Sequence, residues 1–223
     1  VIWREGKFNK SLQISEATTN LVTNPSFETG LTGWTLNNAS GTCTAAQTAL
    51  YNHSGTWSAR LASSTSGAND FYYINVTGLT LSTPYTISAW YRAVTFTAGA
   101  VGNYGLVAYD VDNQGATIQT TTITAASDGW VRKTVTVTTT ATGGSHTIQI
   151  RLYAPNGYTA WDSVQCEAKA YATPYCDGSL GGFSAVGVAD GTGHSWSGTA
   201  HASTSSRLAA NLSYPTSGSL GLF

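Results

Sequence analysis

The chain has 223 residues, of which 9% are charged and 41% are hydrophobic, and its formal net charge is -1. This length suits one large β domain with appendages. The apolar content argues against disorder caused by charge, and the lack of a basic stripe argues against nucleic-acid binding. Thr, Ser and Gly fill the polar positions, as is typical of secreted or virion β proteins. No run of about 18 apolar residues occurs, so we expect no membrane span.

Short strand-like runs separated by Gly or Asn turns recur along the chain, after one plausible strand within Lys7–Ile14. The clear runs are Ser58–Ser63, Phe71–Val76, Tyr85–Val94, Tyr104–Val111, Trp130–Thr138, His146–Tyr153 and Ser163–Glu167. No segment shows a 3.6-residue apolar period. Many short strands at near-regular spacing predict an all-β fold, an antiparallel β-sandwich or jelly roll.

The texture changes near residue 170, which divides the chain into three predicted parts. Residues 1–19 form an N-terminal arm or strand, and residues 20–170 form the sandwich. Residues 171–223 form a Gly- and Ser-rich linker and the start of a truncated second β domain, so both arms are extended. The glycines between 171 and 206 predict loop rather than sheet, and residues 207–223 have weak strand character.

The termini and the cysteines leave two matters open. The chain starts without an initiating Met or a signal peptide and ends on apolar residues, so we expect a fragment or a processed product. Cys166 and Cys176 are ten positions apart and either form a disulfide, which leaves Cys43 over, or remain thiols.

The segment Asn20–Trp34 carries one carboxylate, Glu28, beside an aromatic residue in a chain with few charges. Such a group needs a cation or a set of backbone donors. The segment closely resembles the opening strand of carbohydrate-binding module families 4, 9 and 22. Motifs that resemble later parts of these families follow in order: Ser58–Leu61, Tyr85–Arg92, Tyr109–Gly115, Asp128–Arg132 and Trp161–Glu167. The resemblance covers roughly residues 20–168 and implies a jelly roll that binds glycans.

The resemblance also implies a structural calcium ion that ties the opening strand to the closing strand. The matching carboxylates are Glu28 and Asp162, and the matching backbone oxygens come from Ser26 and the Ser58 region. Calcium prefers such a shell of carboxylate and carbonyl oxygens. The alternative is that each carboxylate caps a turn through backbone N–H groups.

Alternation along the strands separates a core face from an outer face. The outer face carries aromatic, Arg, Gln and Asn side chains, which suit the apolar faces and hydroxyls of a sugar. These residues are Tyr73, Asn75, Trp90, Arg92, Gln149, Arg151 and Tyr153. We predict that they form a glycan site on one sheet. The alternative is that the face is covered and that Trp90 is simply packed.

No pattern points to catalysis, and we expect no enzyme. A glycosidase needs two carboxylates that face each other across a cleft, and no such pair is marked here, although Asp110 and Asp112 lie two apart in a turn. His194 and His201 lie near serines in a Gly-rich loop without a nucleophile elbow.

A second resemblance lies outside the sandwich. Tyr175–Ser179 with His194–Arg207 is similar to a linker of phage tail and bacterial surface proteins that leads into a laminin-G/concanavalin-like sandwich. Tyr214–Phe223 would begin that sandwich, and Gly6–Gln13 resembles one of its strands. We therefore expect a non-catalytic glycan-binding or cell-adhesion module on an extracellular or virion surface. The alternative is a structural subunit of a filament or phage tail, which assembles through its terminal strands without sugar binding.

Overall fold

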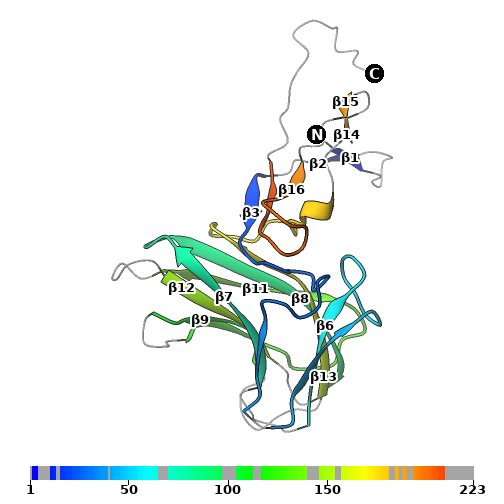
Figure 1. The fold of residues 1–223 in the computed structure, drawn as a ribbon, viewed down its shortest axis with the longest axis vertical. Coiled ribbons are helices and arrows are strands. Elements are labelled where there is room, and N and C mark those ends of the chain that lie inside the picture. The colour runs from blue at the N-terminus through cyan, green and yellow to red at the C-terminus, as the bar shows by residue number, and fades with distance from the viewer. Residues whose placement is uncertain are drawn as a thin grey trace, which may run out of the picture.

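The computed structural model describes residues 2–4, 11–13, 16–39, 41–64, 70–96, 104–112, 117–139, 146–153, 157–180, 184–185, 188–189 and 193–208. These residues form strands and one 3-10 turn, η1 (Gly178–Leu180). Two five-stranded antiparallel sheets make a sandwich, and a smaller sheet lies at one end of it (Figure 1). The predicted all-β antiparallel sandwich is confirmed.

Each of the two large sheets is named after one of its inner strands. The β12 sheet has the order β10 (Thr117–Thr122), β9 (Tyr104–Asp110), β12 (His146–Tyr153), β7 (Phe71–Leu79) and β4 (Thr35–Asn37). The β8 sheet has the order β11 (Val131–Thr138), β8 (Pro84–Phe96), β13 (Gly157–Glu167), β6 (Ser58–Ser63) and β5 (Thr44–Thr48). Strands adjacent in space are thus mostly distant in sequence.

The core lies between the two sheets because alternate residues of each strand are apolar. Ile148 and Ile150 of β12 and Ile87 of β8 are fully buried in one cluster. Trp161 of β13 is also fully buried there and packs 5.6 Å from the ring of Tyr91. The intervening residues of each strand consequently point to the outer faces of the sandwich.

Several strands were missed or shortened by the sequence analysis. β4, β5 and β10 were not predicted, because their Thr- and Ala-containing sequences have little apolar alternation. β13 begins at Gly157 instead of Ser163 and is buried almost throughout, since β6 and β8 pair with it on its two edges. A strand buried on both faces shows no period of two.

The predicted loop between residues 171 and 206 is corrected by the structure. β16 (His194–Trp196) and β17 (Ser205–Arg207) form a three-stranded sheet with β3 (Thr18–Asn20), in the order β16-β17-β3. The name annex is used below for this three-stranded sheet, β3 included, together with the described residues from 171 up to β17. Long-range pairing overrides the weak local strand propensity of a Gly- and Ser-rich segment.

Two isolated hairpins complete the described strands. β1 (Ile2–Arg4) pairs with β2 (Ser11–Gln13), and β14 (Ser184–Ala185) pairs with β15 (Val188–Ala189). The segment Tyr214–Phe223, expected to begin a second domain, lies outside the described residues. Within those residues no helix has the length and apolarity needed to cross a membrane.

The three cysteines are buried free thiols, so Cys166 and Cys176 are not joined. Burial raises the pKa of Cys43 and of Cys166 to about 12, which keeps both thiols protonated at neutral pH.

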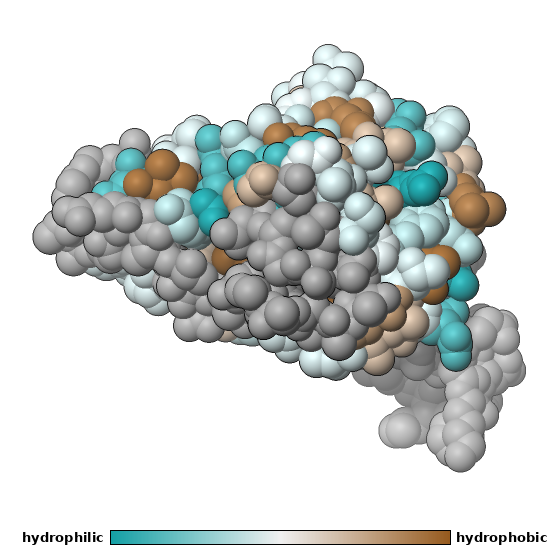
Figure 2. All heavy atoms as spheres, turned by 90° about the horizontal axis from the view of Figure 1, so that it is seen from below, coloured by the Kyte–Doolittle hydropathy of each residue, from teal (hydrophilic) through white to brown (hydrophobic). Residues whose placement is uncertain are grey.

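Exposed apolar residues are scattered in the described part of the chain. The most exposed large ones, Leu50, Leu208 and Tyr171, lie in different segments. Seen from below, the apolar residues form small groups among polar ones (Figure 2). Such scattering is ordinary for a protein surface, so the search for a site turns to specific side-chain clusters.

Candidate functional site

The outer face of the β12 sheet carries a cluster of aromatic and polar side chains, here called the β12 face. Its members are Phe71, Tyr73, Asn75, Tyr109, Gln149, Arg151 and Tyr153. They come together because β12 lies between β7 and β9. The register places Gln149 opposite both Asn75 and Tyr109.

Arg151 lies at the centre of this face. Its guanidinium carbon is 3.4 Å from the ring centroid of Tyr109 and 4.5 Å from that of Phe71. Its Nε donates to Gln149 Oε1 at 2.6 Å, and Gln149 Nε2 donates to Asn75 Oδ1 at 3.1 Å. The cation is therefore held in place by two rings and by a chain of amide hydrogen bonds.

The aromatic residues provide a partly buried base for the face. Phe71 and Tyr153 are buried, with ring centroids 5.0 Å apart, whereas Tyr73 and Tyr109 are half-buried. Asn75 is exposed. Apolar rings beside fixed amide and guanidinium groups are the chemistry that recognises a neutral polyhydroxylated ligand.

The predicted glycan residues are divided between the two sheets, which corrects the expectation that they share one. Trp90 and Arg92 lie on the outer face of β8, in the other sheet. Trp90 stacks on the His53 ring at 4.1 Å, and Arg92 lies 4.4 Å from the ring centroid of Tyr51. The loop that carries Tyr51 and His53 thus packs over this face. Trp90 is therefore packed against other side chains, as the alternative interpretation of the sequence expected.

Five members of the β12 face were predicted from the sequence as site residues, and two, Phe71 and Tyr109, were not. Alternation places Phe71 on the outer side of β7, which was a usable signal. Tyr109 is recognised only from the pairing of β9 with β12. Pairing between strands 40 residues apart is not encoded in local periodicity.

Glu28 and Asp162 are brought to the same loop. Asp162 Oδ2 accepts the backbone N–H groups of His53 and Ser54 at 2.6 and 3.0 Å. Glu28 Oε1 accepts those of Thr56 and Trp57, both at 2.8 Å. These bonds are the turn-capping arrangement, and they place both carboxylates beside one short stretch of backbone.

Burial dominates the ionisation of Asp162. Burial, with a smaller contribution from the negative charge of Glu28, raises the pKa of this carboxyl to about 8 against the opposing effect of its backbone N–H donors. Ser26 is buried and its side chain lies beside the Tyr175 hydroxyl, whereas Ser58 Oγ donates to the carbonyl of Tyr51. Two carboxylates beside backbone carbonyl oxygens are donor types that fit calcium.

A second group with metal-binding side chains lies at the end of the β12 sheet. One ligand atom each of Asp110, Asp112 and His146 lie within 4.8 Å of one another. Asp110 Oδ1 accepts the backbone N–H of Asp112, and Asp112 Oδ2 accepts that of Thr147. The Asp110 carboxylate therefore caps the turn that follows β9, whereas the Asp112 carboxylate binds the backbone of β12.

A family model described as carbohydrate binding domain matches residues 19–163, which is more than half of the chain. The chain belongs to this carbohydrate binding domain family. A search of curated proteins finds no match for it.

Solved structures share the fold of this carbohydrate binding domain. They include the N-terminal modules of Clostridium thermocellum xylanase 10B in complex with xylohexaose, 18% identical with a TM-score of 0.51, over 69% of this chain and 29% of that one. A Stig cyclase from Fischerella sp. TAU is 17% identical with a TM-score of 0.51, over 69% and 98%. A family 22 xylan-binding domain is 15% identical with a TM-score of 0.50, over 69% and 97%. One fold thus carries different activities, so function must be argued from the site.

The loop of this carbohydrate binding domain gives a first test of the carboxylate caps. Gly55 has a φ of 65°, and a Cβ there would lie 2.4 Å from Glu28 Oε1. Gly55→Ala should lower the free energy of unfolding by about 1 kcal/mol through backbone strain. This free energy should fall by about a further 1–2 kcal/mol as Glu28 moves away from its N–H donors. Gly30→Ala is the matched control, because φ is 75° there and nothing lies within 4 Å. Equal urea midpoints for the two variants would contradict the role of Glu28.

Proposed function

We propose that this chain is a non-catalytic module that binds a neutral polysaccharide or cell-surface glycan on the β12 face. The observation that carries the proposal is Arg151, which two aromatic rings and Gln149 hold in a fixed position at the centre of a half-exposed aromatic surface. A fixed polar group beside ring faces reduces the ordering cost of binding a flexible sugar chain. Family membership supports the same ligand class.

An extracellular or virion-surface setting is part of the proposal. It rests on the composition, in which Thr, Ser and Gly replace most charged residues. Xylan is the first probe to use, because two structures with this fold are described with xylan or xylohexaose. A glycan array then extends the search to other neutral chains.

The β12 face is tested by single substitutions against xylohexaose and the array glycans. Tyr109→Ala and Arg151→Ala should each weaken binding about tenfold, since an aromatic or cation contact of this kind is worth about 1–2 kcal/mol. Trp90→Ala is the control on the β8 sheet, where His53 already covers the ring. Isothermal titration calorimetry measures the dissociation constants.

The outcomes separate three readings. If Tyr109→Ala and Arg151→Ala bind the glycan more weakly and Trp90→Ala binds it as the unmodified chain does, the proposal is supported. If only Trp90→Ala binds more weakly, the site lies on the β8 sheet. No binding by the unmodified chain to any glycan favours the structural role in a filament or tail.

We also propose a structural calcium ion beside Glu28 and Asp162, with backbone oxygens of Ser26 and of the Ser58 region as further ligands. The support is the burial of Asp162 next to a second carboxylate on the same loop. A bound cation would offset the cost of two negative charges at this loop.

A further inference from the structure

A groove of about 500 Å³ lies along β7 where β4 ends. β4 pairs only with Phe71–Tyr73, and among the described residues no other strand pairs with this edge of β7. Asn75, Thr77 and Thr80 line the groove on the side of the sandwich. Its volume is within the range of small-molecule sites.

Other lining residues of the groove lie outside the strands of the two large sheets. Leu21 comes from the opening segment, Ala168 follows β13, and Thr204 precedes β17. Ala168 and Thr204 both lie beyond residue 163, where the family match ends. The annex therefore contributes Thr204 to a groove whose other lining residues belong to the sandwich, the opening segment and the chain just after β13.

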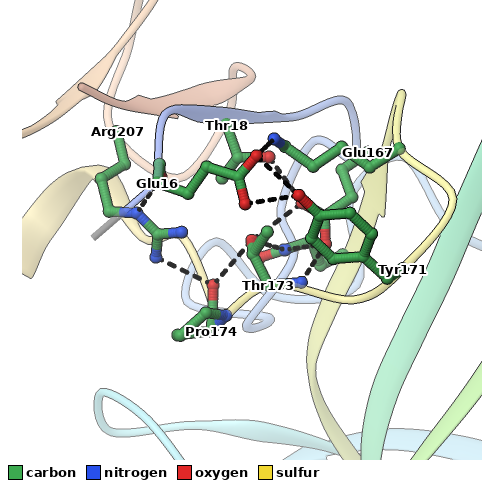
Figure 3. A network of polar contacts seen from close by, with 9 residues as sticks. Glu16, Thr18, Glu167, Tyr171, Thr173, Pro174 and Arg207 are labelled. Atoms are coloured by element: carbon green, nitrogen blue, oxygen red, sulfur yellow. Dashed lines mark hydrogen bonds and ion pairs between the residues drawn. The ribbon is translucent and has the colours of Figure 1, made fainter. Parts of the chain in front are cut away.

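Buried hydrogen bonds fix the annex against the sandwich (Figure 3). Glu167 is fully buried, and its carboxylate accepts bonds from Thr18 Oγ1 at 2.6 Å and from the backbone N–H of Thr173 at 2.8 Å. Arg207 donates to the carbonyls of Glu16 and Pro174, both at 3.0 Å. The part of the groove that Thr204 lines is consequently preformed, which lowers the entropy cost of filling the groove.

The groove carries polar and apolar side chains, as the β12 face does. Among the described residues no charged side chain lines it, and its walls combine threonine hydroxyls with apolar side chains. Asn75 belongs to both surfaces, because it lines the groove and accepts a hydrogen bond from Gln149 on the face. The two surfaces thus meet at Asn75, and Arg151 is the charged side chain on the face beside it.

We propose that this groove, to which the annex contributes Thr204, is an additional subsite for the continuation of a neutral glycan chain bound on the β12 face. The inference rests on the proposed function. A short oligosaccharide fills the face alone, and a longer one crosses Asn75 and enters the groove between Thr77 and Thr204. The module therefore selects extended internal chain segments over short chains.

The test compares the affinities for short and long oligosaccharides in variants whose groove is filled by a larger side chain. Thr77→Arg and Thr204→Arg each place a long cationic side chain in the groove, from the sandwich and from the annex. Thr138→Arg adds the same side chain at an exposed position of β11 in the other sheet. Calorimetry measures binding of the trimers and hexamers of the xylo- and cello-oligosaccharide series.

The unmodified chain and Thr138→Arg should bind the hexamer about tenfold more tightly than the trimer. Both groove variants should lose this preference while their affinity for the trimer stays unchanged. If the groove variants keep the preference, or if the unmodified chain binds trimer and hexamer equally, the subsite is refuted and the β12 face stands. If no oligosaccharide binds the unmodified chain, the proposed function and the subsite fall together.

Discussion

Ending the chain at residue 170 is expected to lower its free energy of unfolding by at least about 3 kcal/mol relative to a chain that ends at residue 208. The cut removes both Thr173 donors to the buried Glu167 carboxylate. It also removes the Thr173 carbonyl that accepts from Arg132 and the Cys176 N–H that donates to Gln165. Polar groups buried at the end of β13 then lose their partners.

A milder variant keeps this prediction testable if the short chain does not fold. Thr173→Val in the full chain removes a hydroxyl that contacts Glu167 Oε2 at 2.8 Å and leaves the backbone donor in place. It should cost about 1–2 kcal/mol, whereas Thr199→Val, at an exposed annex position, should cost almost nothing. Urea unfolding followed by circular dichroism gives both values. Identical midpoints for chains ending at 170 and 208 would place the domain boundary at residue 170, as the sequence texture predicts.

The second large effect is a loss of stability as pH rises in the presence of a chelator. Burial raises the pKa of Asp162 from 3.8 to about 8 in the folded chain. A carboxyl with a raised folded pKa stabilises the fold below its unfolded pKa, and this contribution is lost as pH rises through the folded value. Between pH 5 and pH 7 the free energy of unfolding should therefore fall by up to about 1.4 kcal/mol per pH unit.

Two comparisons isolate this effect. Asp162→Asn should flatten the slope of the free energy of unfolding against pH, and Asp128→Asn, at an exposed position, should leave that slope unchanged. Groups that titrate in both proteins cancel in the difference between their slopes. A slope that persists in Asp162→Asn would show that another group titrates.

The same experiment decides the calcium proposal. Millimolar calcium should remove the slope in the unmodified chain, because a cation beside Glu28 and Asp162 stabilises the ionised carboxylate. It should also raise the urea midpoint at pH 8 and have no such effect on Asp162→Asn. A slope and a midpoint that are the same in chelator and in calcium would leave the two carboxylates as turn caps alone.

The sequence by itself determined the fold class and the facing of most side chains. Alternation in His146–Tyr153 separates the buried Ile148 and Ile150 from Gln149 and Arg151, because a strand turns each successive side chain to the opposite face. The motif around Glu28 likewise indicated the family that the match to residues 19–163 shows. These signals are local, so one sequence carries them.

Only the tertiary structure decided which of these side chains meet. The order of strands separates Trp90 from Arg151 and brings Tyr109 to Arg151, because pairing in a sandwich depends on contacts between distant segments. The annex strands have weak propensity and form because β3 offers an edge and Glu167 supplies a buried acceptor. Local periodicity gives each strand two faces, and long-range packing determines which faces form a site.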